Sequence, residues 1–201
     1  MLIHNLSGKF SAASETAKGW LLYQDYELVS WLFLRALGII YLIAFASLLV
    51  QVKGLVGEQG ILPVTDLLSY VTAETGAERY FVLPGIFWFS HGNLALVGAC
   101  IYGCIVSLQI IFNRWQRPAL IIAFILYLSL FNVCQPFLHF QWDGLLLEAG
   151  FLAIFLGLRS SIIIWLFRWL LFKLRFMSGL SKLTSGDPAW SGLTLSLIHI
   201  S

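Results

Sequence analysis

Six polar side chains are candidates for chemistry in this largely apolar chain, because their types could support acid–base or metal chemistry. They are His91, Asn93, His139, Gln141, Asp143 and Glu148. Asp143 and Glu148 are five residues apart, which on a helix means about 7.5 Å of rise and about 140° of rotation. The two carboxylates therefore fall on different faces of a helix and do not form a paired general acid and base.

Metal and redox chemistry are poorly supported by the residue spacing. A metal site needs three or four ligands, and the chain lacks the HxxxH and CxxC spacings that supply them. Cys100, Cys104 and Cys134 lie inside apolar runs, where we interpret them as small apolar side chains. We therefore expect no metal and no cofactor. His139 and Asp143, four residues apart, are predicted to hydrogen-bond locally.

Glu148 lies within an apolar run and has two possible roles. An ionisable group at membrane depth is a candidate functional group by default. The structural alternative is a neutral glutamic acid, buried in the bundle, that hydrogen-bonds to a neighbouring helix. On this structural hypothesis Asp143 lies at the rim, stays ionised and holds the local turn through His139 or a backbone amide.

The elements that carry these residues are predicted to be membrane helices. The chain has 201 residues, of which 59% are hydrophobic and 11% charged, and its mean hydropathy is +0.86. Ordinary globular proteins carry about 25% charged residues. The net charge of +2 gives no reason to expect a nucleic-acid partner. We predict an all-α integral membrane protein.

The apolar runs predict a polytopic bundle of four to five transmembrane helices. Residues 1–27 are polar, lack the features of a signal peptide and are expected to be cytoplasmic. The transmembrane domain is expected over 28–180. Its spans are predicted at about 28–52, 94–112, 119–138, 144–158 and 161–180. The last is either a span or an interfacial amphipathic helix, because Arg168, Lys173 and Arg175 interrupt it, and charge counting favours four spans.

Charge in the short connectors predicts the orientation of the bundle. Arg114 and Arg117 lie between two apolar runs, which places that connector on the cytoplasmic side. By alternation, the long loop 53–93 and the segment 139–143 face the other side. Within the loop, the stretch 66–81 has the spacing of a surface helix.

Packing between the second span and its neighbours is also predicted. Ala99 and Gly103 are four residues apart, and such small-residue pairs allow two helices to approach closely.

Four segments, in this order, resemble the amino-terminal membrane region of the lipase maturation factor family. They are FLRALGIIYLIAF at 33–45, GLVGEQGILPV at 54–64, FQWDGLLLEAGFLAIF at 140–155 and RWLLFKLRFMSGLSKLTSGDPAW at 168–190. The resemblance favours five spans. It implies a protein of the endoplasmic reticulum membrane, or of the inner membrane in a bacterium, that helps secreted dimeric lipases reach their active form. The implied partners are the lipid bilayer and lipase clients, and the implied role is not catalytic.

The carboxyl end departs from the family pattern. Members continue past a GDPxW motif into a large lumenal domain, so residues 181–194 would be the start of that domain. LSLIHIS at 195–201 resembles a translated sequencing adapter, and we expect it to be non-native. The chain would then be a membrane anchor without its client domain.

A membrane enzyme is the alternative hypothesis. The bundle is similar in outline to the vitamin K-dependent carboxylase and to quinone-linked oxidoreductases. Glu148 and the rim of His91, His139 and Asp143 would then be the remains of a reaction site, although likeness at the level of the fold is a weak argument for function.

Overall fold

The computed structural model describes residues 26–157 and 160–185. Every regular element within these residues is a helix, which confirms the all-α fold. The expectations for the amino-terminal segment up to residue 25, for the end of 181–194 and for the tail 195–201 lie outside the described residues.

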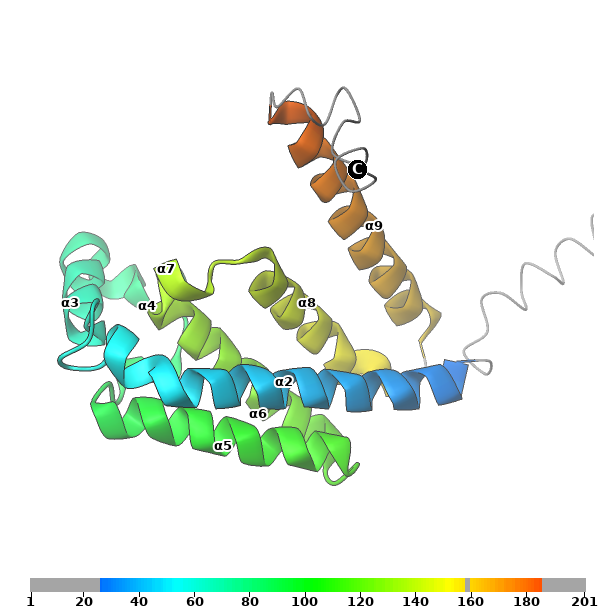
Figure 1. Cartoon of the computed structure of the whole chain (residues 1–201), viewed down its shortest axis with the longest axis horizontal. Helices are drawn as coiled ribbons and strands as arrows, with labels where there is room; N and C mark the ends of the chain where they lie inside the picture. The colour runs from blue at the N-terminus through cyan, green and yellow to red at the C-terminus, as the bar shows by residue number, and fades with distance from the viewer. Residues whose placement is uncertain (1–25, 158–159, 186–201) are drawn as a thin grey trace, which may run out of the picture.

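The longest helix is α2 (Glu27–Val56), which forms one side of the bundle (Figure 1). Its 30 residues extend about 45 Å, more than the roughly 30 Å hydrocarbon core of a bilayer. The buried side chains recur every three or four residues, as expected for a helix with one face in the core. They include Leu37, Tyr41, Phe45, Leu48 and Val52.

Three further helices pack against α2 in sequence. They are α5 (Asn93–Ile111), α6 (Gln116–Val133) and α8 (Gln141–Leu156). Helix α5 makes the most extensive contact with α2, and α6 lies between α5 and α8. The connector before α6 turns sharply, because Asn113 and Trp115 both adopt positive φ angles, 57° and 51°.

The predicted close approach of α5 to a neighbour is confirmed. Ala99 and Gly103 are both buried, and the neighbour is α2. A Cβ atom at Gly103 would overlap the ring of Phe45, so only glycine fits beneath that ring. Gly98, on the outward face of α5, has open space around it.

Within the described residues, three helices are long and apolar enough to cross a membrane, namely α2, α5 and α6. The protein is therefore an integral membrane protein. Helix α8 has 16 residues, about 24 Å, and α9 (Ser161–Thr184) carries several cations. Both lie outside this group of three, so the choice between four and five spans stays a prediction.

The segment between α2 and α5 contains short helices. They are α3 (Val64–Thr75), η2 (Gly76–Glu78), α4 (Arg79–Val82) and η3 (Ile86–Trp88). A helix in this loop was expected, and α3 confirms it. The end of α6 holds the segment in place: Ser129 Oγ accepts a hydrogen bond from the Ile86 amide at 3.1 Å, and Asn132 Nδ2 donates to the Pro84 carbonyl at 2.7 Å.

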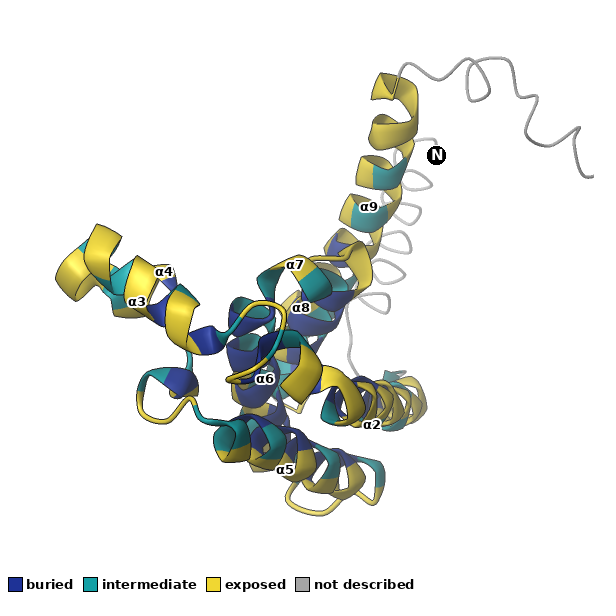
Figure 2. Cartoon of the chain, turned by 60° about the vertical axis from the view of Figure 1, so that its left-hand side comes forward, coloured by how far each residue is buried: buried dark blue, intermediate teal, exposed yellow. Residues whose placement is uncertain are grey.

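Helix α9 leans away from the other helices towards its carboxyl end (Figure 1). Ile163 and Leu170 are its buried residues, and most of its surface is exposed (Figure 2). Cavities lie along α9, one against α8 and others against α2 and α8.

Candidate functional site

A buried tyrosine–aspartate pair joins α6 to α8. Tyr127 Oη donates a hydrogen bond to Asp143 Oδ1 at 2.6 Å, and neither residue has any exposed surface. The backbone of Phe140, the residue that precedes α8, also hydrogen-bonds to this carboxyl group. In a capping box, the side chain at the third helical position accepts a hydrogen bond from the backbone N–H of the residue before the helix, and Asp143 holds that position in α8. Within the described residues, Oδ2 of Asp143 has no hydrogen-bond partner.

An aromatic cluster surrounds this pair on the side of α2. The rings of Tyr41 and Phe45 both meet the ring of Tyr127 edge to face, with centroids 5.8 and 5.6 Å apart. Gly150 of α8 leaves the space that the Tyr41 hydroxyl occupies. Three helices therefore converge where Asp143 is buried, and the geometry suits a fixed packing centre better than a site open to substrate.

The structural hypothesis for the two acids is wrong about their environments. It placed Asp143 at the rim and Glu148 in the core, but Asp143 is 0% exposed and the Glu148 side chain is 46% exposed. Of the two partners predicted for Asp143, the backbone amide is confirmed, because the backbone of Phe140 hydrogen-bonds to the carboxyl group. The predicted hydrogen bond with His139 is wrong, because the carboxyl group turns inward and accepts from Tyr127. The cause is helical phase: Asp143 lies on the face of α8 that meets α6, and Glu148 is rotated about 140° from it.

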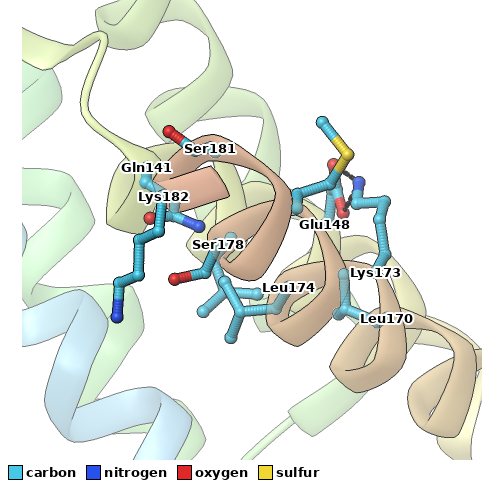
Figure 3. Close-up of a pocket in the computed structure, with 11 residues that line it drawn as sticks. Gln141, Glu148, Leu170, Lys173, Leu174, Ser178, Ser181 and Lys182 are labelled. Atoms are coloured by element: carbon cyan, nitrogen blue, oxygen red, sulfur yellow. Dashed lines mark hydrogen bonds and ion pairs between the residues drawn. The ribbon is translucent and has the colours of Figure 1, made fainter. Parts of the chain in front are cut away.

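Glu148 forms an ion pair with Lys173 of α9. Lys173 Nζ donates to both carboxylate oxygens, at 2.5 and 2.6 Å. The two side chains are 46% and 45% exposed, and they point into the space between α8 and α9 (Figure 3). Glu148 does join two helices, as the structural hypothesis stated, but through an ion pair and not as a buried neutral acid.

The ion pair borders a groove between α8 and α9, which we call the α8–α9 groove. Its cavity has a volume of about 480 Å³. Gln141 and Gly144 of α8 lie on one wall, and Ser178, Ser181 and Lys182 of α9 lie on the other (Figure 3). Polar side chains of both charges thus face each other beside an apolar helix. The groove could hold water or a polar segment of a protein.

The remaining polar residues do not gather around Asp143. His139 is exposed and its ring meets Phe131 edge to face, with centroids 4.8 Å apart. Gln141 is exposed at the mouth of the α8–α9 groove, and His91 is exposed in the connector that precedes α5. No hydrogen bond or ion pair links His91 to His139 in the part of the chain that the structure describes.

Asn93 has a structural role that the sequence did not reveal. Its Oδ1 accepts a hydrogen bond from the backbone N–H of Glu58 at 3.1 Å, and the backbone N–H of Asn93 donates to Glu58 Oε1 at 3.4 Å. This reciprocal pair fastens the turn after α2 to the first turn of α5. An acid near the amino terminus of a helix is also favourable for the helix dipole.

The described residues contain no group of three or more histidine, cysteine, aspartate or glutamate side chains that could hold a metal ion. The three cysteines are free thiols in the helical core and its edges. Among the acids that the sequence singled out, Asp143 thus makes a buried hydrogen bond and Glu148 a half-exposed ion pair.

A family model described as the lipase maturation factor transmembrane domain matches residues 28–200. The chain belongs to the lipase maturation factor family. Lipase maturation factor 2 of Xenopus laevis is 38% identical over 195 residues, covering 87% of this chain and 27% of the relative.

Mammalian relatives give the same result. Human lipase maturation factor 2 is 35% identical over 196 residues, covering 84% of this chain and 27% of the relative. Mouse lipase maturation factor 1 is 34% identical over 186 residues, covering 83% of this chain and 32% of the relative. The chain therefore spans about a quarter to a third of the length of these relatives. No solved structure matches the chain.

Proposed function

We propose that this chain is the membrane part of a maturation factor that helps secreted lipases reach their active form. The observation that carries the proposal is the family match over residues 28–200. The relatives are named maturation factors and carry no enzyme name. The proposed clients are lipases that act as dimers, and the proposed location is the endoplasmic reticulum membrane, or the inner membrane in a bacterium.

The proposed role is non-catalytic. A carboxyl group with no exposed surface cannot reach a substrate, and Asp143 has none. Asp143 and Tyr127 would instead fix α6 against α8, so that the helices present constant surfaces to the rest of the protein. The α8–α9 groove, with Glu148 and Lys173, is the surface where we place contact with polar segments of the maturation machinery.

We further propose an orientation for the bundle. The connector between α5 and α6 would be cytoplasmic, and the loop from residue 57 to residue 92 would be lumenal. Arg117 supports this arrangement, because its guanidinium donates to the Gly157 carbonyl at 2.7 Å and so gathers the ends of two helices on the basic side.

The test is a rescue experiment in cells that lack their own maturation factor. Residues 28–185 would replace the matching region of the Xenopus laevis relative, and the chimera would be expressed with a dimeric secreted lipase. We expect secreted lipase activity to return, whereas a secreted lipase that acts as a monomer should be unaffected. A chimera that reaches the membrane in normal amounts without restoring activity would contradict the proposal.

A further inference from the structure

An apolar groove runs between α2 and α9, with α8 as its floor. We call it the α2–α9 groove. It consists of two adjoining cavities of about 280 and 430 Å³, which share Phe33, Phe167 and Leu171. The rings of Phe33 and Phe167 meet edge to face at 5.0 Å, where the two cavities join. The deeper cavity continues along α2 to Ile40.

One end of this groove is basic. Arg168 lines it together with Tyr26, and the guanidinium donates to the tyrosine hydroxyl at 2.8 Å. The same guanidinium lies over the ring of Trp165, 5.0 Å from its centroid. These contacts direct the cation towards the amino-terminal end of α2. The rest of the groove is lined almost entirely by apolar side chains.

The dimensions of the groove match one leaflet of a bilayer. From Tyr26 to Ile40 the axis of α2 advances about 21 Å. Half of a hydrocarbon core of about 30 Å is about 15 Å. A chain anchored beside Arg168 could therefore lie within the groove to the depth of the bilayer midplane.

We propose that the α2–α9 groove binds one acyl chain of an anionic phospholipid, with the lipid phosphate on Arg168. Arginine suits this role because its planar guanidinium matches the oxygens of a phosphate. The tyrosine hydroxyl adds a further polar contact at the level of the headgroup. The proposal is independent of the lipase-maturation function, because it depends only on the shape and charge of the groove.

The test uses the full chain in nanodiscs that contain a small fraction of a photoactivatable lipid. The probe is phosphatidylserine with a diazirine on one acyl chain, and phosphatidylcholine with the same modified chain is the zwitterionic comparison. Cross-linked residues are identified by peptide mass spectrometry. We expect the anionic probe to label Phe33, Phe167 or Leu171 about fivefold more than the zwitterionic one, the effect of a single arginine on an anionic lipid.

Two variants and one control complete the design. Arg168→Gln should reduce labelling by the anionic probe to the zwitterionic level, whereas Leu171→Trp should block the groove and reduce labelling by both probes. Arg35→Gln is the matched control, because Arg35 stacks on Trp31 and projects from the face of α2 opposite Phe33.

Three results would overturn the proposal. Equal labelling by both lipids around all faces of α2 would mean ordinary annular lipid. Absence of labelling in the groove would mean that another protein segment or a second copy covers it. If the anionic probe still labelled the groove of the Arg168→Gln variant as strongly as before, Arg168 would not be the residue that holds the lipid phosphate.

Discussion

The Tyr127–Asp143 hydrogen bond offers the sharpest test of how the bundle is held together. Tyr127→Phe removes the donor and leaves both oxygens of a fully buried carboxyl without a side-chain partner. Asp143→Leu removes the acceptor and leaves the buried phenol unpaired. Each change should lower the free energy of unfolding by about 1–3 kcal/mol, the cost of an unsatisfied buried polar group.

The double variant separates this hydrogen bond from simple packing. With Tyr127→Phe and Asp143→Leu together neither side chain leaves a polar group unpaired. The Phe140 backbone loses its partner both in Asp143→Leu and in the double variant, so this loss cancels, and the double variant should lose less than the sum of the single losses by about 1–3 kcal/mol. Unfolding in mixed detergent micelles, followed by circular dichroism, gives the four free energies. Tyr41→Phe is the matched control, because its hydroxyl lies 3.5 Å from the Leu146 carbonyl, too far for a strong hydrogen bond. Additive losses within about 0.5 kcal/mol would refute the reasoning.

Three further outcomes follow from the packing and the topology. Gly103→Leu should place a side chain against Phe45 and lower the unfolding free energy by about 1–3 kcal/mol. Gly98→Leu is the control and should be tolerated, because Gly98 lies on the open face of α5. Equal losses of unfolding free energy in detergent would contradict this prediction. Glu148→Gln should cost no more than about 1 kcal/mol, as for other exposed ion pairs, and normal folding with loss of lipase maturation would instead favour the enzyme hypothesis. A cysteine at Glu74 should react with an impermeant maleimide from the lumenal side, and reaction only from the cytoplasm would reverse the proposed orientation.

Much of the fold follows from apolar periodicity, and the deviations have local causes. Helix α2 continues to Val56, beyond the predicted end at residue 52, because buried residues keep their spacing while Lys53 faces outward. Helix α6 begins at Gln116 and not at residue 119. Pro118 is tolerated in its first turn, where a backbone N–H has no partner within the helix.

The candidate site was harder to predict, because its contacts join residues that are far apart in the sequence. Tyr127 stands within an apolar run and gives no sign that its hydroxyl points at an acid 16 residues later. The residue types identified Asp143 and Glu148 as important, but not which one faces the core. That depends on the rotation of α8 against α6, and an almost uniformly apolar helix does not reveal its rotation through its hydrophobic pattern.

The Glu148–Lys173 ion pair also bears on whether α9 crosses the membrane. Charge counting favours four spans because it keeps Lys173 and Arg175 on the cytoplasmic side. In the structure Lys173 is neutralised by Glu148, and Arg168 reaches the hydroxyl of Tyr26 at the beginning of α2. Of the two cations that charge counting used, Lys173 therefore has an acidic partner on a neighbouring helix. An ion pair is less unfavourable at membrane depth than a single charge, particularly beside a groove that can admit water. The choice between four and five spans stays a prediction, and the pairing of Lys173 with Glu148 removes one of the two cations on which the case for four depended.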